Sequence, residues 1–172
     1  MLETREGGCH CGRVRFRAEV DLDLLSHCSC SVCTKKGFLH LIVPLNQFEV
    51  VRGADALTTY QFNTGTAKHW FCASCGMHPF YVPRSDPDKI DVNARCLEGI
   101  DPSRLRVSCF DGQNWDDAFR SRASQRARAR PSSPSRTRPA ASSTRAGSTW
   151  RPRSRGPTRS IAIPSTQGAT PW

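Results

Sequence analysis

Clustered cysteines constrain this sequence more than any other feature. The chain contains 9 cysteines, and all except Cys96 and Cys109 fall into three short motifs. These motifs are Cys9-His-Cys11, Cys28-Ser-Cys30-Ser-Val-Cys33 and Cys72-Ala-Ser-Cys75. The N-terminus lacks the apolar core of a signal peptide, so we expect a cytoplasmic protein in a reducing compartment. Clustered thiols in that setting hold a metal or react more often than they form disulfides.

The first and third motifs together predict a structural zinc site. Cys72-x-x-Cys75-Gly76 has the spacing of a zinc knuckle, in which a tight turn directs two thiolates at one metal ion. Structural zinc needs four ligands, and Cys9 and Cys11 lie two apart, so in an extended segment they point to the same side. The alternative is a redox pair at Cys72 and Cys75, although no strand–helix–strand pattern surrounds them.

The middle motif predicts a different kind of zinc site. Cys28, Cys30 and Cys33 place three thiolates in one short segment, which leaves the fourth position of a tetrahedral zinc open. An open position is typical of catalytic zinc, and a soft metal there favours an exogenous thiolate, so the substrate itself is expected to be a thiol. Two alternatives stay open: a fourth protein ligand from His10, His27 or Cys96, or three reduced thiols without metal.

Short segments with alternating or β-branched residues predict an all-β domain over residues 1–119. Residues 13–20 alternate charged and apolar side chains, which is the period of a half-buried strand. Gly, Pro, Asn or Asp separate the further strands expected. Those strands are residues 40–43, 48–52, 57–62, 68–72, 78–82, 90–94 and 105–110. Short helical turns are expected at Ser31–Lys36 and at residues 102–105.

Residues 120–172 have a different composition and are expected to form a disordered tail. The acidic residues all lie in residues 1–119, whereas the tail is rich in Arg, Ser and Pro and contains no acidic residue. Such a tail suits binding to nucleic acid or another polyanion. The alternative interpretation is an inert tail, or the product of GC-rich DNA translated in a shifted frame. No apolar stretch is long enough to cross a membrane.

Taken in order, these motifs resemble the glutathione-dependent formaldehyde-activating enzyme family, which also includes centromere protein V. The resemblance extends from about Glu6 to Trp115. It rests on Gly7-Gly8-Cys9-His10-Cys11-Gly12-x-Val14-x-Phe16, Cys28-Ser29-Cys30-x-x-Cys33-x-Lys35-x-Gly37, Tyr60-x-Phe62-Asn63-Thr64, Phe71-Cys72-x-x-Cys75-Gly76, Pro83-Arg84-Ser85, Val92-Asn93-Ala94-Arg95-Cys96-Leu97 and Phe110-Asp111-Gly112-x-Asn114-Trp115. It implies a β-tent (Mss4-like) fold built of short antiparallel strands around a structural zinc.

The resemblance also implies ligand sets and an activity. It makes Cys9, Cys11, Cys72 and Cys75 the ligands of the structural zinc. It makes Cys28, Cys30 and Cys33 the ligands of a catalytic zinc, so two Zn²⁺ are expected per chain. The implied reaction joins glutathione, or a similar thiol, to formaldehyde or a related aldehyde and gives S-hydroxymethylglutathione, which is carbon–sulfur lyase chemistry in reverse.

Other side chains are weaker candidates. His10 and His27 each suit a proton relay or a structural hydrogen bond. Four cations, Lys35, Lys36, Arg84 and Arg95, are either partners for the carboxylates of glutathione or solvated surface charges. Alternation places Cys96 and Cys109 in the core, outside any ligand set. The aromatic residues are expected in the core and in pocket walls: Trp70, Phe71, Phe80, Tyr81, Phe110 and Trp115.

Two functions compete with the zinc enzyme. One is a non-catalytic zinc-binding interaction module whose basic tail binds nucleic acid or another polyanion. The other is a purely structural zinc protein with two closed sites. The enzyme predicts a labile second zinc and saturable glutathione binding, whereas the binding module predicts salt-sensitive binding that is lost without the tail.

Overall fold

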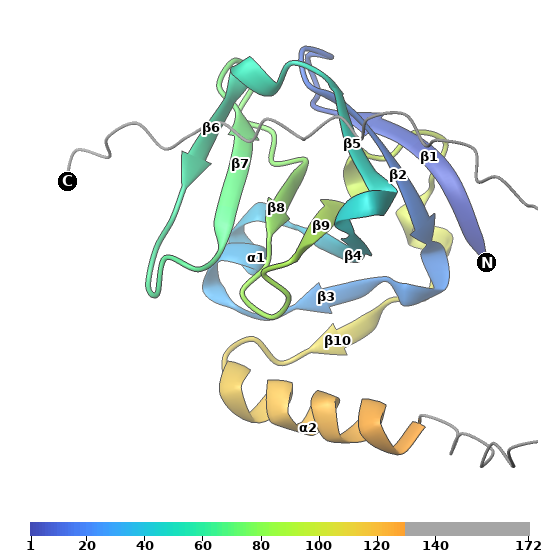
Figure 1. Cartoon of the computed structure of the whole chain (residues 1–172), viewed down its shortest axis with the longest axis vertical. Coiled ribbons are helices and arrows are strands. Elements are labelled where there is room, and N and C mark those ends of the chain that lie inside the picture. The colour runs from blue at the N-terminus through green and yellow to red at the C-terminus, as the bar shows by residue number, and fades with distance from the viewer. Residues whose placement is uncertain (130–172) are drawn as a thin grey trace, which may run out of the picture.

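Two β-sheets packed around one core form the fold, and the all-β prediction is confirmed (Figure 1). The computed structural model describes residues 1–129, without the side chains of Pro102 and residues 126–129. The smaller sheet has the strand order β1 (Leu2–Gly8), β2 (Arg15–Asp21), β5 (Phe48–Arg52). The larger sheet has the order β10 (Ser108–Phe110), β3 (Ser26–Cys28), β4 (Leu39–Pro44), β9 (Lys89–Asn93), β8 (Phe80–Val82), β7 (Lys68–Cys72), β6 (Leu57–Tyr60).

Helical segments connect and flank the strands. Within residues 1–129 the α-helices are α1 (Ser31–Lys36) and α2 (Trp115–Ala129). Short 3₁₀ turns occupy Leu22–Leu24, Leu45–Gln47, Ala54–Ala56, Ala94–Cys96 and Pro102–Arg104. Neighbouring strands pair antiparallel except β10, which pairs with β3 in parallel. Among the described residues, no helix is both long and apolar enough to cross a membrane.

Aromatic side chains join the two sheets. In β2 the alternation seen in the sequence buries Phe16, Ala18 and Val20 and leaves the charged residues between them outside. The Phe16 ring lies 5.7 Å from Phe48 of its own sheet and 5.6 Å from Phe80 of the larger sheet. The first pair is stacked and the second meets edge to face, and both geometries are favourable for aromatic rings. Cys9 directly follows β1 of the smaller sheet and Cys72 ends β7 of the larger sheet, so the packing of the two sheets brings these cysteines near each other.

The sequence analysis missed two strands. β1 carries four charged or polar residues among seven and has no buried apolar stripe, yet it pairs along its whole length with β2. β3 is only three residues long, too short for a periodic pattern, and lies between β10 and β4. Both strands are defined by pairing with partners rather than by their own composition, so local patterns did not reveal them.

Helix α2 corrects the expected boundary at Phe119. The helix begins at Trp115 and continues to Ala129, so the prediction that disorder begins at residue 120 was wrong for residues 120–129. This segment is poor in apolar residues, which suggested disorder, but Ala, Arg and Gln favour helix and Asp116 and Asp117 lie in its first turn. The rest of the expected tail, residues 130–172, lies outside the described residues.

Candidate metal centres

Four of the predicted ligands form one thiol cluster. The sulfur atoms of Cys9, Cys11, Cys72 and Cys75 all lie within 4.8 Å of one another. The Cys9 and Cys11 sulfurs are 3.5 Å apart, and those of Cys11 and Cys72 are 3.7 Å apart. Tetrahedral zinc with Zn–S bonds of about 2.3 Å separates its sulfur ligands by about 3.8 Å. The cluster therefore has the size and the donor set of a closed zinc site.

A tight turn after β7 sets the geometry of this cluster. The Cys72 N–H donates to the Met77 carbonyl at 2.8 Å, and the Gly76 N–H donates back to the Cys72 carbonyl at 2.8 Å. Gly76 has a φ of 70°, a left-handed conformation that glycine adopts without strain. On the other side of the cluster, the Val14 N–H donates to the Cys9 sulfur at 3.2 Å. The Cys-x-x-Cys-Gly motif is thus a turn that aims two thiols at the end of β1.

The other three predicted ligands form a separate cluster at the end of β3. The sulfur atoms of Cys28, Cys30 and Cys33 lie within 4.8 Å of one another. Cys28 ends β3, Cys30 directly precedes α1, and Cys33 lies inside α1, so one strand-to-helix turn brings the three together. Neither a histidine nor Cys96 joins this group among residues 1–129. All nine cysteines of the chain are free thiols.

Sharing of protons among these three thiols favours a thiolate at Cys30. Hydrogen bonds from Cys28 and then Cys33 lower the pKa of the Cys30 thiol to about 2, and the N–H groups of Cys33 and Val32 act in the same direction. Hydrogen bonding to Cys30 raises the pKa of Cys28, and the same interactions with Cys28 and Cys30 raise that of Cys33. Metal ions bind thiolates rather than thiols, so the cluster already stabilises the form that a metal needs.

Gly112, which was named above only within a family motif and without a role, lies at this centre. A Cβ atom at this position would overlap the Cys28 sulfur and lie 2.6 Å from the Cys30 nitrogen. Two hydrogen bonds with Ser29 hold the loop after β10 beside the thiols. The Ser29 hydroxyl donates to the Asp111 carboxylate at 3.2 Å, and the Gly112 N–H donates to the Ser29 hydroxyl at 3.0 Å. Any side chain at residue 112 would push this loop away from the thiols.

A cavity of about 510 Å³ opens beside the three thiols, and we call it the thiol cavity. Besides Cys28, Cys30 and Cys33, its walls include Phe62, His69, Tyr81 and Trp115. One cation lies in the wall, Arg84, whose guanidinium stacks 3.5 Å from the centre of the Trp115 ring and lies 3.8 Å from the Asp116 carboxylate. Stacking on an aromatic ring leaves the edge of a guanidinium available to a carboxylate.

The remaining candidate cations lie elsewhere. Lys36 lies over the Tyr60 ring at 5.7 Å, and the Arg95 side chain donates to the Gly37 carbonyl at 2.9 Å. Lys35 is exposed. Of the four cations considered as partners for glutathione, only Arg84 lines the thiol cavity.

Histidines outside the sequence-based candidates occupy the interior. His10 and His27 are exposed, whereas His40, His69 and His78 are buried. Burial lowers the pKa of His69 to about 4 and that of His78 to about 2, so both rings are neutral near pH 7. The Nδ1 atom of His40 lies 2.8 Å from an Asp91 carboxylate oxygen. No local motif marks these three residues. They come from β4, from β7 and from the segment before β8, so only the fold brings them together.

The two isolated cysteines differ in environment. Cys96 is buried, as expected, and burial raises the pKa of its thiol to about 12. Cys109 is exposed, so its predicted place in the core was wrong. It lies in β10, an edge strand in which both Ser108 and Cys109 face outward. Neither cysteine is part of the two thiol groups that could hold a metal ion among the described residues.

The expected aromatic residues line the core and the cavities. Trp70, Phe80 and Tyr81 are buried, and Phe71, Phe110 and Trp115 are half-buried. Tyr81 borders the thiol cavity and stacks on His69, with ring centres 4.7 Å apart.

Comparisons with known proteins agree with these features. The model of the family described as glutathione-dependent formaldehyde-activating enzyme matches residues 4–111. A crystal structure of a Rhodobacter sphaeroides protein is 41% identical in sequence, with a TM-score of 0.58, and the match covers 60% of this chain and 98% of that one. The described fold is of the all-β, Mss4-like type that the resemblance implied. The chain belongs to the glutathione-dependent formaldehyde-activating enzyme family.

Proposed function

We propose that this protein joins the thiol of glutathione to formaldehyde, giving S-hydroxymethylglutathione, as a zinc-dependent carbon–sulfur lyase working in the direction of synthesis. One observation carries the proposal. Three thiols lie within 4.8 Å of one another without a fourth protein ligand among residues 1–129, and they border a 510 Å³ cavity. A closed structural site would offer neither the open position nor the adjoining space.

Each thiol cluster has its own task in this proposal. Cys9, Cys11, Cys72 and Cys75 hold a structural Zn²⁺, and Cys28, Cys30 and Cys33 hold a catalytic one, so the chain carries two. When bound, the catalytic zinc supplies an open position that suits a soft thiolate ligand. The proposed compartment is the cytoplasm, where thiols stay reduced and glutathione is abundant.

The cavity walls bind and orient the thiol substrate. Arg84 lies at the edge of the cavity with its planar face on Trp115, and its N–H groups suit one of the carboxylates of glutathione. Phe62 and Tyr81 provide apolar surface for the backbone of the tripeptide. Binding both reactants beside Cys28 turns a reaction between two dilute molecules into one between neighbours.

In the reaction a carbon–sulfur bond forms and the π bond of the aldehyde breaks. The thiol proton ends on the former carbonyl oxygen, so the overall addition needs no other reactant. The neutral ring of His69 borders the cavity and adds no positive charge that would compete with Arg84 for the carboxylates.

Zinc content and exchange kinetics test the proposal together. Protein purified without chelator should contain two zinc ions per chain, one of which is lost on dialysis and retained when glutathione is present. Two-dimensional exchange NMR should show faster interconversion of glutathione and S-hydroxymethylglutathione with the protein than without it.

Matched cysteine variants separate the sites. Cys28→Ser should lose the labile zinc and the rate enhancement, whereas Cys109→Ser, outside both clusters, should keep both. A wild-type protein that holds one zinc and ignores glutathione would refute the proposal.

A further inference from the structure

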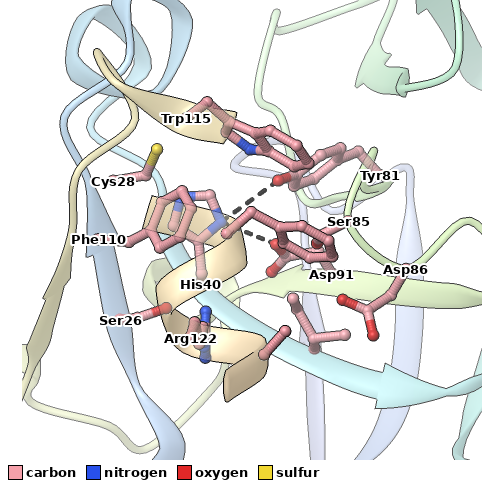
Figure 2. A pocket seen from close by; sticks show the side chains of 13 residues that line it. Ser26, Cys28, His40, Tyr81, Ser85, Asp86, Asp91, Phe110, Trp115 and Arg122 are labelled. Carbon is pink, nitrogen blue, oxygen red and sulfur yellow. Dashed lines mark hydrogen bonds and ion pairs between the residues drawn. The ribbon is translucent and has the colours of Figure 1, made fainter. Parts of the chain in front are cut away.

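A second cavity meets the thiol cavity at the catalytic cluster. It has a volume of about 340 Å³ and shares four lining residues with the thiol cavity: Cys28, Tyr81, Ser85 and Trp115. Figure 2 shows Cys28, Tyr81 and Trp115 around this second cavity, with Phe110 beside them. A molecule that binds beside Cys28 therefore has two cavities to occupy, and both are lined by Trp115. We call the second space the aryl cavity.

One face of α2 forms a wall of the aryl cavity. Trp115, Phe119 and Ala123 follow one another at helical spacing, and all three line the cavity. The Trp115 and Phe119 rings stack with their centres 4.8 Å apart, and Phe110 meets Trp115 at 6.4 Å. This helix lies outside residues 4–111, the segment that matches the family model. Of the aromatic residues in this wall, Phe110 and Trp115 belong to the stretch that resembles the family, whereas Phe119 lies beyond it.

The charged side chains that line the aryl cavity each have a partner. Asp91 pairs with His40 at 2.8 Å, and Asp86 pairs with Lys89 at 2.6 Å. The Arg122 guanidinium lies 5.9 Å from the centre of the Phe110 ring, which engages part of its charge. Together with the aromatic wall, these pairs favour a neutral, apolar occupant over an ionic one.

We propose that the aryl cavity holds the substituent of the aldehyde, and that this protein acts on aldehydes carrying an aryl or bulky alkyl group in addition to formaldehyde. The inference rests on the proposed function. Once the thiol lies in the thiol cavity, the carbonyl carbon lies beside Cys28, and its substituent points to the remaining space. Formaldehyde carries only hydrogen there, whereas 340 Å³ is in the range of pockets that hold whole small ligands, about 300–1,000 Å³.

Larger aldehydes react with the same bond changes. The thiol sulfur bonds to the carbonyl carbon, the π electrons move to the oxygen, and the thiol proton ends on that oxygen. The substituent takes no part in the chemistry and contributes through burial of its apolar surface against Phe110, Trp115 and Phe119.

Stable thioether analogues of the two adducts test the inference by binding. Titrations of the zinc-loaded protein, followed by calorimetry and by ¹H–¹⁵N NMR, would compare S-methylglutathione with S-benzylglutathione. S-benzylglutathione should bind about tenfold more tightly and shift the amide signals of Phe119 and Ala123, which S-methylglutathione should leave in place. Equal affinities, or a benzyl group that leaves the α2 signals unchanged, would overturn the inference.

Two phenylalanine variants separate the cavities. Phe119→Ala should reduce the preference for S-benzylglutathione to about twofold and keep the affinity for S-methylglutathione, which also shows that the protein is folded. Phe62→Ala, in the wall of the thiol cavity alone, should weaken both analogues by a similar factor. If the Phe119→Ala protein keeps the full preference for S-benzylglutathione over S-methylglutathione, the proposed role of the aryl cavity is wrong.

Glutathione and benzyl alcohol serve as fragments that separate the two proposals. If glutathione fails to bind while benzyl alcohol still shifts the Phe119 signals, the proposed function fails and the aryl cavity stands. If glutathione binds and benzyl alcohol shifts nothing on α2, the aryl cavity fails and the proposed function stands.

Discussion

The two thiol clusters differ in how the chain closes around them. Four cysteines from two distant segments surround the first, whereas three cysteines from one strand-to-helix turn form the second and border a cavity. The first cluster joins the end of β1 to the turn after β7, so it ties together the two sheets. In the proposed function one ligand type therefore serves two purposes: the ligands distant in sequence hold a metal that stabilises the fold, and the local set leaves room for a substrate.

Removing a ligand of the four-cysteine cluster should have the largest effect. Cys11 is exposed, so Cys11→Ser changes little packing, and its effect reports the loss of a metal ligand. We expect a loss of more than about 4 kcal/mol in the free energy of unfolding, measured by urea denaturation, with release of the tightly held zinc. Cys109 is also exposed, so Cys109→Ser should change the free energy of unfolding by less than about 0.5 kcal/mol. Similar stabilities for the two variants would remove the contrast between the clusters.

A change at Gly112 should affect the second cluster alone. Because a Cβ atom at residue 112 would overlap the Cys28 sulfur, Gly112→Ala should weaken retention of the labile zinc by about 10- to 100-fold, measured by competition with a chelator. The tightly held zinc should stay. Gly65→Ala is the control for backbone strain: its φ of 69° makes any side chain there strained, but a Cβ atom meets nothing within 4 Å, so the labile zinc should be retained. Loss of both metals in Gly112→Ala would show that the clusters are not independent.

Acid should destabilise the layer of histidines next to the second cluster. The pKa values of His69 and His78, about 4 and about 2, lie below the ordinary value near 6.5, so the unfolded chain binds more protons as the pH falls. Stability should therefore decrease from about pH 6.5 down to about pH 4, by up to about 1.4 kcal/mol per pH unit for each histidine. Denaturation curves of wild type and His69→Phe between pH 4 and 7 measure this, and the variant should show the shallower slope. Parallel slopes would argue against a neutral buried His69.

Arg84 should have the smallest effect of the four changes. Arg84→Ala should raise KM for glutathione about fivefold and leave kcat nearly unchanged, because the interaction is made before and during the reaction alike. Arg95→Ala is the matched control, since Arg95 contacts the Gly37 carbonyl and does not line the thiol cavity. An equal rise of KM in both variants would point to general electrostatic attraction rather than to a specific contact.

The sequence predicted the parts of this molecule that local spacing determines. Cys72-x-x-Cys75-Gly76 and Cys28-x-Cys30-x-x-Cys33 are turns whose geometry follows from a few consecutive residues, and both group as expected. The alternation of residues 13–20 likewise predicted β2, which the structure places at Arg15–Asp21. The chemistry of neighbouring residues was therefore accessible without the fold.

Features that depend on long-range pairing were not accessible. Gly112 lies beside Cys28 only because β10 pairs with β3, and His40 meets Asp91 only through the pairing of β4 with β9. The outward direction of Cys109 follows from the edge position of β10. Helix α2 was missed for another reason: its mean composition is that of a disordered segment, although its individual residues favour helix.

The separation between Cys11 and Cys72 along the chain also has a consequence for biosynthesis. In the proposed function the Cys28–Cys33 segment carries all three of its ligands within one strand-to-helix turn, so its ligand set is complete as soon as this turn leaves the ribosome. The four-cysteine cluster cannot form until Cys75 has been synthesised, and Cys9 and Cys11 must stay reduced until then. During that interval a growing chain exposes two unpaired thiols near its beginning. Speed of translation through residues 12–75 therefore sets how long the future structural site is open to oxidation or to the wrong metal.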